Sequence, residues 1–298
     1  MWRTRISGIE VRRVEEMLRP GFDPAFLYPN YDKAVLAGHP LLARPEFLDA
    51  ASGRLMSSMQ SWLVRAGREI ILIDTGCGNG KVREHPAFRR FHMLDLPYLD
   101  NLAACGVRPE DVTLVVNTHL HVDHVGWNTR LENGRWVPTF PNAKYVFSRV
   151  DREHWDPAAN PALPAVNAGV FEDSVAPVIE SGQARLVEMN DRLGDNFVIE
   201  PAPGHTPGHV VFRLLDGGEE AVFTGDVMHH PIQVYRPEWS SAFCTDSRAA
   251  VRSRRRVLEH CAECAARVFP AHFGAPHVGR VRRRADGFAF DFDRGDAA

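Results

Sequence analysis

Histidine and aspartate residues crowd into one short stretch of the chain, at His119, His121, Asp123 and His124. The stretch reads NTHLHVDHVGW and follows an apolar run that ends at Val116. In extended backbone, residues two positions apart point to the same side, so His119 and His121 share a face. Neutral imidazole and carboxylate groups are suitable ligands for Zn²⁺ and similar cations. The stretch therefore predicts a metal site where a buried strand ends.

Further residues of ligand type follow other apolar runs. The segment PAPGHTPGH holds His205 and His209, AVFTGD ends at Asp226, and VFPAHFG contains His272. Asp74 in LIDTG has the same placement upstream. One such residue at a strand end is weak support, but an ordered series predicts that several strands deliver ligands to one place. We expect His209 to be structural within its Gly/Pro turn and leave it out of the ligand set.

The elements that must position these residues alternate between strands and helices, which is typical of a layered α/β domain. Strands are expected at 9–14, 61–66, 69–74, 114–117, 144–148, 197–201, 209–215 and 221–224, with weaker candidates at 268–270 and 288–292. Helices are expected at 97–105, 150–154, 166–180 and 246–265.

Five motifs together resemble those of the metallo-β-lactamase superfamily, over about residues 62–280: IDTG (73–76), THLHVDH (118–124), PGHTPGH (203–209), TGD (224–226) and AHF (271–273). The resemblance implies a single-domain, four-layered αββα sandwich with a two-metal site at one edge of its sheets. By position it implies that the first metal is held by His119, His121 and His205, the second by Asp123, His124 and His272, and that Asp226 bridges both. Asp74 would orient the metal ligands by hydrogen bonding to them without binding the metal itself.

The expected domain boundaries place the catalytic domain at 61–293, with an N-terminal strand and an irregular lid or interface segment at 1–60 that belongs to the same domain, and a loose tail at 294–298. The aromatic residues of 19–60 have no expected strand or helix to bury them. Because a large exposed apolar patch usually marks an interface, this segment predicts a homodimer.

Single residues separate the branches of the superfamily. Asp226 argues against true β-lactamases, which typically lack the bridging aspartate, and His121 argues against the oxygen-reducing diiron branch, which has Glu there. The layout is most similar to the lactonase and methyl-parathion-hydrolase-like group. This implies a dinuclear-metal-dependent hydrolase that uses a bridging hydroxide to open a lactone or cleave a carboxylic ester. A phosphotriester hydrolase, a glyoxalase-II-like thioester hydrolase and a non-catalytic metal-binding member remain alternatives.

Two residues are expected to take part in the chemistry beyond binding metal. Asp123 would pass a proton to the leaving group, and His229 would donate a hydrogen bond to the developing oxyanion. His229 stands where quorum-signal lactonases often have Tyr, so the resemblance does not extend to their substrate preference. Trp127 and Met228 are candidates for the substrate pocket. Two divalent ions per chain are expected, zinc by default, with iron, manganese or cobalt as alternatives because His and Asp ligands select weakly among them.

Composition excludes other classes of protein. The net charge of −3 gives no basic excess for nucleic acid, and no apolar run is long enough for a membrane span. The N-terminus lacks the apolar core of a signal peptide, and five cysteines are an odd number, so a reducing cytoplasm is expected. The Cys261-x-x-Cys264 pair lies in a predicted helix, where packing is the preferred explanation. The expected partner is a small ester or lactone.

Overall fold

The computed structural model describes residues 2–163, 165–188 and 190–295. The chain divides into two compact units. The first unit comprises Met1–Gly8, Leu18–Ser58 and Asn190–Ala298, and the second unit comprises Ile9–Met17 and Met59–Met189. Two long strands, β2 (Ile9–Pro20) and β3 (Met56–Ala66), contain residues of both units.

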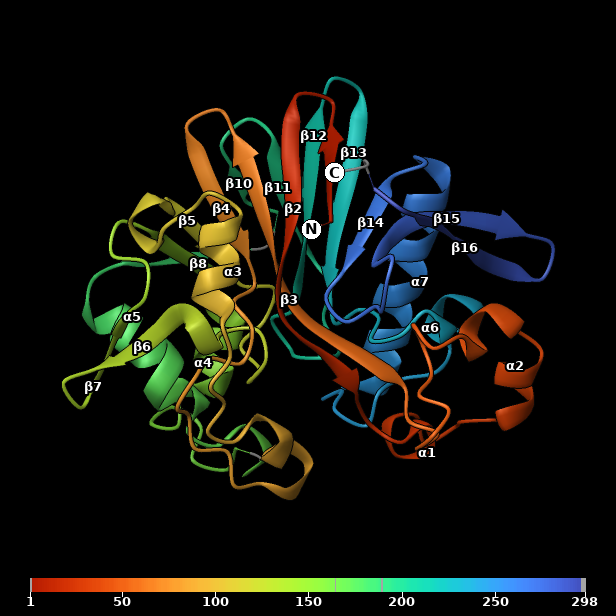
Figure 1. Ribbon diagram of the computed structural model, residues 1–298, viewed down its shortest axis with the longest axis horizontal. Coiled ribbons are helices and arrows are strands. Elements are labelled where there is room, and N and C mark those ends of the chain that lie inside the picture. The colour runs from red at the N-terminus through yellow and green to blue at the C-terminus, as the bar shows by residue number, and fades with distance from the viewer. Residues whose placement is uncertain (1, 164, 189, 296–298) are drawn as a thin grey trace. The chain divides into compact units, whose positions relative to one another are not determined.

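The second unit is built on a sheet in which β2, β3, β4, β5, β8 and β9 follow one another (Figure 1). Its further strands are β4 (Glu69–Ile73), β5 (Leu114–Val116), β8 (Lys144–Ser148) and β9 (Ala184–Val187), with a separate hairpin of β6 (Thr129–Glu132) and β7 (Arg135–Pro138). From β4 to β9 the strands are parallel. Parallel strands present their carboxyl ends at one edge of a sheet. The segments after β4, β5 and β8 therefore start from the same edge.

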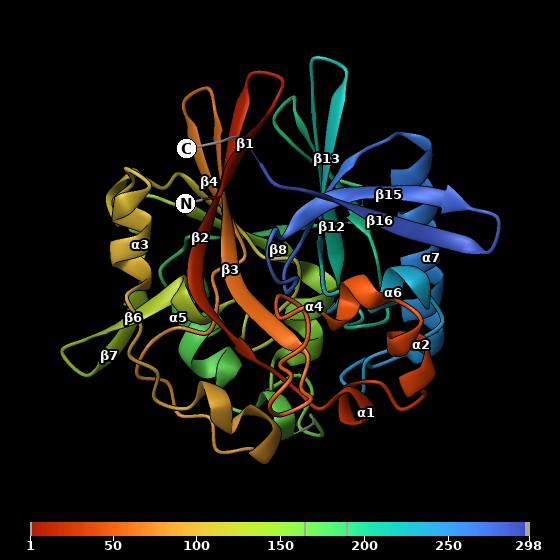
Figure 2. The same ribbon diagram turned by 45° about the vertical axis from the view of Figure 1, so that its right-hand side comes forward.

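Short helices flank this sheet (Figure 2). They are α3 (Tyr98–Ala104), α4 (Arg149–Trp155) and α5 (Ala176–Glu180), with 3₁₀ helices at Pro86–Phe91, Pro109–Asp111, Gly126–Asn128 and Ala165–Asn167 and a π-helical turn at Phe171–Val175. The expected helix over 166–180 is confirmed only in its later part, because helical backbone runs from 170 to 180 and the residues before it form a separate 3₁₀ turn. The positive φ of Gly169 interrupts it, and Pro177 cannot donate a backbone hydrogen bond within a helix.

The first unit contains a sheet whose strands follow the order β10 to β16. The strands of this sheet are β10 (Arg192–Leu193), β11 (Phe197–Pro201), β12 (Val210–Asp216), β13 (Glu219–Gly225), β14 (Arg267–Pro270), β15 (Val278–Arg284) and β16 (Gly287–Asp293). The unit also contains β1 (Arg3–Ile6), which is not part of this sheet. β13 and β14 are parallel, and β12 is antiparallel to β13. The carboxyl ends of β13 and β14 and the amino end of β12 therefore lie at the same edge.

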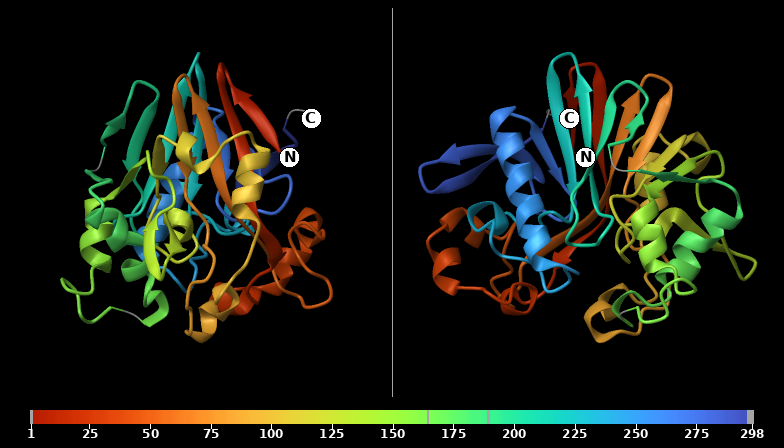
Figure 3. Two further views of the ribbon diagram at one scale, coloured as in Figure 1. Left: turned by 60° about the vertical axis from the view of Figure 1, so that its left-hand side comes forward. Right: turned by 180° about the vertical axis from the view of Figure 1, so that it is seen from behind.

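Helix α7 (Ser247–Glu263) lies along this sheet (Figure 3). The Asp246 side chain caps it by accepting from Ala249 N. Its buried residues recur at helical spacing, and Val257, Leu258 and Cys261 join the core of the sheet. Cys261 therefore packs in the core as the sequence predicted, whereas Cys264 is exposed.

Most aromatic residues of 19–60 are buried or partly buried inside the first unit, with Tyr28 and Phe47 buried and Phe22 and Tyr31 partly buried. Two short helices, α1 (Pro24–Leu27) and α2 (Lys33–Ala37), and a 3₁₀ helix at Pro40–Ala43 place apolar side chains against Ile232 of α6 (Ile232–Tyr235) and Trp239. Tyr28 is fully buried, while Phe26 is 49% exposed. The expectation that these aromatics form an exposed patch is wrong, so the reason for expecting a homodimer through this segment is lost. Oligomeric state stays a prediction.

Residues 296–298 of the expected tail lie outside the described residues. Among the helices of the described ranges, none combines the length and the apolar character needed to cross a bilayer.

Candidate metal centre

The loop after β5 gathers four predicted ligands in the second unit. His119 Nε2 lies 3.1 Å from His121 Nδ1, and the rings of His119 and His124 are 4.0 Å apart between centroids. Asp123 Oδ1 lies 3.7 Å from His124 Nε2. The three histidines are buried, and Asp123 is partly exposed. The structure therefore brings together every ligand that the sequence places in this unit.

Asp74 holds this loop from the end of β4. Its carboxylate accepts from Thr118 N at 2.8 Å and from Thr118 Oγ1 at 2.9 Å, and it contacts His124 Nδ1 at 2.9 Å. Asp74 itself has a positive φ of 55°, a strained conformation for a residue that is not glycine. The contact fixes the His124 ring so that its Nε2 faces Asp123. Asp74 thus contacts a predicted ligand, and its role in orienting metal ligands stays a prediction.

A buried carboxylate that sequence reasoning missed anchors the neighbouring turn. Glu16 on β2 accepts from Cys77 N at 2.7 Å, Gly78 N at 2.9 Å and Trp127 Nε1 at 2.8 Å. Complete burial raises the pKa of Glu16, although these three donors oppose the shift. Gly126 packs so close to Cys77 that a Cβ atom would lie 1.9 Å from a backbone carbon, which explains the glycine after the histidine motif.

Asp226 is the centre of the first-unit cluster. It follows β13, and its carboxylate has a histidine on each oxygen: His272 Nε2 lies 2.8 Å from Oδ1, and His205 Nε2 lies 3.2 Å from Oδ2. His229 Nε2 also lies 3.2 Å from Oδ2. The atoms of His205, Asp226 and His229 are close enough together to hold one ion. The strand order explains why these residues lie together. His205 precedes β12, Asp226 follows β13 and His272 follows β14, and these strand ends lie at the same edge of the sheet.

The ring nitrogens of His205 and His272 that point away from Asp226 contact other groups. His205 Nδ1 lies 3.7 Å from Cys244 Sγ, and His272 Nδ1 donates to Ser58 O at 2.9 Å. His209 Nε2 accepts from Asp226 N at 3.0 Å, so His209 holds the backbone beside the carboxylate. Such outer contacts fix which ring nitrogen is available to a metal.

The loop that carries Asp226 is also held from α7. Arg254 is fully buried, and its guanidinium donates to the carbonyl oxygens of Val227, Pro237 and Trp239 at 2.7–2.8 Å. A buried cation needs such partners to offset its desolvation. The helical pattern predicts that position 254 faces the core but does not indicate which carbonyl groups a buried arginine there would bind.

Burial lowers the pKa of His205 and His229, and the Asp226 carboxylate raises it. Burial alone would lower the pKa of His205, but Asp226 and Cys244 outweigh it and raise the pKa to about 9. Burial dominates at His229 and lowers its pKa to about 4 despite Asp226. The imidazole of His229 is therefore neutral near pH 7. A metal ion taking the place of the His205 proton would release that proton on binding.

The donor set fits metal ions. Two nitrogen ligands of a tetrahedral zinc ion are expected ~3.3 Å apart, given Zn–N bonds of ~2.05 Å. The His119–His121 pair is 3.1 Å apart, and the His205–Asp226 pair is 3.2 Å apart. His124, His205 and His272 each present Nε2 to a carboxylate while Nδ1 is occupied elsewhere. This is the ligand arrangement that such ions use.

The two predicted pocket residues lie in packed surroundings. Trp127 is 5% exposed, bonds Glu16 and stacks on Tyr98 with ring centroids 5.1 Å apart. Met228 is fully buried in the core cluster beneath α7. Their contact with a substrate stays a prediction. Cys244 was not predicted, because nothing in the sequence brings residue 244 beside His205.

Known proteins share both sequence and fold with this chain. A hydroxyacylglutathione hydrolase of Synechococcus sp. is 31% identical over 134 residues, which is 43% of this chain and 40% of that protein. An N-acyl homoserine lactonase, AttM, of Azorhizobium caulinodans is 32% identical over 114 residues, 37% of this chain and 39% of the lactonase. The matched part thus spans about two fifths of these curated relatives.

The solved structure of hydrolase AbOPH, described as a member of the beta lactamase superfamily, is 25% identical to the chain. The match covers 97% of this chain and 96% of the other, with a TM-score of 0.81. Residues 58–272 match the family described as the Metallo-beta-lactamase superfamily. That match covers well over half of the sequence. The chain therefore belongs to the metallo-β-lactamase superfamily and has its fold.

Proposed function

We propose that the chain is a metal-dependent hydrolase that opens lactones or cleaves carboxylic esters. The observation that carries this proposal is the Asp226 carboxylate, with the Nε2 atom of a different histidine at each of its oxygens. A carboxylate with one imidazole per oxygen is the arrangement expected of a ligand shared by two cations. The resemblance to an N-acyl homoserine lactonase supports an ester or lactone as the bond that is cleaved.

The ligand assignment follows the sequence resemblance and is part of the proposal. His119, His121 and His205 would hold one ion, Asp123, His124 and His272 would hold a second, and Asp226 would contribute to both. Zinc suits this set of nitrogen and oxygen donors, and iron, manganese and cobalt remain alternatives. The short distances among the ligands within each unit support the assignment.

Two cations held there would supply an activated water and would polarise the carbonyl oxygen of the substrate. The chain supplies the remaining steps. Asp123, the only partly exposed carboxylate of its loop, takes a proton from the attacking water and delivers it to the leaving oxygen. His229, neutral near pH 7, can donate an N–H to the oxygen that becomes negative. Asp74 keeps the His124 ring fixed throughout.

Thioester hydrolysis is the second candidate, because the hydroxyacylglutathione hydrolase of Synechococcus sp. is also a relative. A thiolate leaves without prior protonation more readily than an alkoxide does, since a thiol has a pKa of about 8.5. A thioesterase would therefore depend much less on Asp123 than an ester hydrolase. The Asp123→Asn variant separates the two candidates through its effect on each substrate.

The test is a panel of substrates with the zinc-loaded protein: a γ-lactone, an aryl ester, a phosphotriester and a glutathione thioester. The proposal predicts that kcat/KM is highest for the lactone or the ester. Preference for the thioester would move the assignment to the second candidate. Turnover of none of them by protein that contains metal would refute a hydrolase of this class.

A further inference from the structure

A second cluster of ligand-type side chains lies in the first unit, at the carboxyl end of α7. It joins Glu220 on β13 with His260 in the last turn of α7 and Cys264, the residue that caps this helix. The His260 Nε2 atom lies 2.7 Å from Glu220 Oε1, and His260 Nδ1 lies 3.8 Å from Cys264 Sγ. A carboxylate, an imidazole and a thiol therefore meet around one ring, and none of them belongs to the candidate metal centre.

The spacing of these three side chains suits a metal ion. One donor atom from each of them lies within 4.8 Å of one from each of the others. Zinc bonds of ~2.05 Å to nitrogen and ~2.3 Å to sulfur place two tetrahedral ligands ~3.5 Å apart. The contact of 3.8 Å between His260 and Cys264 is close to this value. The two residues are four positions apart, so they lie on one face of the helix.

Glu220 is in the right state to bind a cation. Its burial opposes ionisation, but hydrogen bonds that Arg213 and His260 donate outweigh this and lower the pKa of Glu220. Arg213 Nε lies 2.6 Å from Oε1, and Arg213 Nη2 lies 3.2 Å from Oε2. A carboxylate can accept about four hydrogen bonds, so these contacts leave Glu220 able to bind an ion as well.

The Cys-x-x-Cys spacing does not supply a second thiolate. Cys261 is fully buried, and burial raises the pKa of its thiol, so Cys261 keeps its proton. Cys264 is exposed, and its sulfur lies beside His260. The ligand set is therefore one carboxylate, one imidazole and one thiolate. A tetrahedral ion held by three protein ligands keeps its fourth position for water.

We propose that Glu220, His260 and Cys264 bind a zinc ion that is separate from the candidate metal centre. Thiolate and imidazole together favour zinc over magnesium or calcium. As the ion binds, the S–H bond of Cys264 breaks, the proton goes to solvent and the thiolate bonds the metal. An imidazole binds an ion through one nitrogen, so one of the two contacts of His260 lengthens, and the exposed Cys264 side chain has room to turn. The ion ties the end of α7 to β13, the strand that leads to Asp226.

An ion pair alone accounts for less of the cluster. A protonated His260 is favoured at the carboxyl end of a helix and beside Glu220, which explains the contact of 2.7 Å. It gives no role to the thiol of Cys264, which lies on the other ring nitrogen of His260. A zinc ion uses all three groups.

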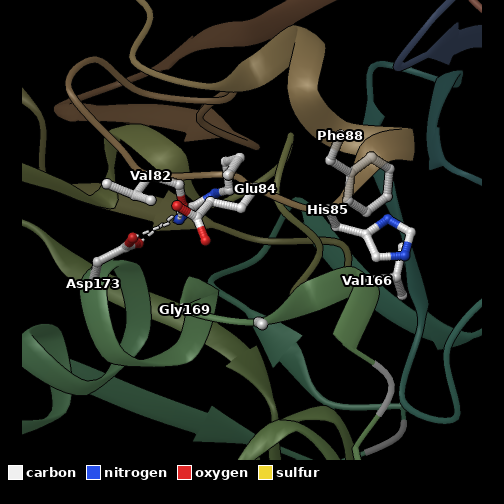
Figure 4. Close-up of a pocket in the computed structure, with 9 residues that line it drawn as sticks. Val82, Glu84, His85, Phe88, Val166, Gly169 and Asp173 are labelled. Carbon is white, nitrogen blue, oxygen red and sulfur yellow. Dashed lines mark hydrogen bonds and ion pairs between the residues drawn. The ribbon is translucent and has the colours of Figure 1, made fainter.

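A cluster of charged residues in the second unit is less suited to a metal ion. It lies at a hollow of about 530 Å³, where Asp173 contacts Arg83 (Figure 4). Lys81 Nζ lies 3.4 Å from the same carboxylate. Two cations at one carboxylate repel a third, whereas a cation at Glu220 would also gain a thiolate.

The first experiment counts zinc in the wild type and in Cys264→Ser. Both proteins are loaded with excess zinc, passed over a desalting column and kept reduced with a phosphine. We expect Cys264→Ser to hold about one equivalent per chain less than the wild type. This difference does not depend on how many ions the candidate metal centre holds. Glu263→Gln changes the exposed neighbour of Cys264 and is the matched control, which should hold as much zinc as the wild type. Equal zinc in the wild type and Cys264→Ser would overturn the proposal.

Cobalt identifies the ligands. Thiolate bound to Co²⁺ absorbs strongly in the near ultraviolet by charge transfer, whereas imidazole and carboxylate ligands do not. The cobalt-loaded wild type should show this absorption more strongly than Cys264→Ser. Loss of groups that merely support a metal ligand costs 10–100-fold in affinity, so His260→Ala should need at least about tenfold more cobalt to reach half of the band. Identical spectra for the wild type and Cys264→Ser would contradict the thiolate ligand.

Melting temperature tests whether the ion stabilises the folded chain. A ligand that binds the folded state raises its stability, so excess zinc should raise the melting temperature of the wild type more than that of Cys264→Ser. An equal rise in the two proteins would contradict binding of an ion at the end of α7. The kcat for a lactone should be the same in both, because the cluster shares no residue with the candidate metal centre. If no ester or lactone is hydrolysed but the zinc counts differ, the proposed function fails and this site stands.

Discussion

Asp173 pairs with two buried cations, and its removal should destabilise the second unit strongly. Its carboxylate accepts from Arg83 Nη1 at 2.6 Å and from Arg83 Nη2 at 2.9 Å, and Lys81 Nζ lies 3.4 Å away. The Lys81 side chain is 0% exposed and that of Arg83 is 3% exposed. Breaking a buried ion pair by removing one partner costs about 3–5 kcal/mol. We therefore expect Asp173→Asn to lose about that much free energy of unfolding at pH 7.

The loss should depend on pH through Lys81. Burial lowers the pKa of Lys81 from 10.5 to about 8, although Asp173 opposes the shift. The folded protein therefore binds fewer protons than the unfolded chain between these values, and wild-type stability rises with pH across this window by roughly 3 kcal/mol. Without Asp173 the Lys81 pKa should fall further, so that Lys81 is already neutral near pH 7. The penalty of the substitution should then shrink by about 1–2 kcal/mol between pH 7 and pH 9.

Urea unfolding at pH 7 and pH 9 measures both quantities. The matched control is Asp291→Asn, which breaks the pair of Asp291 with Arg282, in which both side chains are more than half exposed. Asp291→Asn should change the free energy of unfolding little at both pH values, because exposed ion pairs contribute little to stability. A loss below about 1 kcal/mol for Asp173→Asn would refute the account of this cluster. A large loss that is identical at the two pH values would refute the role given to Lys81.

Further predictions concern the metal ligands and their supports. Asp226→Ala should weaken the binding of both metal ions, whereas His272→Ala should chiefly empty the second site. Elemental analysis after dialysis measures the metal that each variant retains. Equal loss at both sites in both variants would contradict the assignment. Asp123→Asn should retain much of its metal while kcat falls by about two orders of magnitude. The fall in kcat should be smaller for esters that have acidic leaving groups, because these leave without protonation. An equal fall in kcat for every leaving group would argue against proton transfer by Asp123. Gly126→Ala should fail to fold or should unfold at a much lower temperature in calorimetry, because its Cβ would overlap the backbone at Cys77; a melting temperature near that of the wild type would show that the turn can rearrange.

Strands made largely of apolar residues were well predicted from their apolar runs. β8 and β11 were expected at the bounds they have, 144–148 and 197–201. The β6–β7 hairpin was missed because its strands carry charged residues and bury little of their length. The signal was present at Asn133-Gly134, where both residues have positive φ, the usual requirement of a tight hairpin turn. The Asn-Gly pair predicts this hairpin, whereas the pattern of apolar residues does not.

The clustering of the candidate ligands was predictable because His and Asp residues recur at successive strand ends. The groups that hold the ligands were less predictable. Asp74 was expected from its motif, but Glu16, Cys244 and Arg254 carry no local signal. The run RRVEEML does not show which glutamate will be buried, because that depends on a partner more than 60 residues away. Such contacts are a property of the tertiary structure and not of a short pattern.

The central claim is that bound metal makes this chain a hydrolase of esters or lactones. The most direct measurement is the hydrolysis of a γ-lactone by metal-stripped protein as zinc is added in steps, with metal and protein quantified in the same samples. The account predicts no turnover without metal and a rate that saturates at about two equivalents per chain. Turnover that persists in the stripped protein, or none with two equivalents bound for lactone and aryl ester alike, would contradict it.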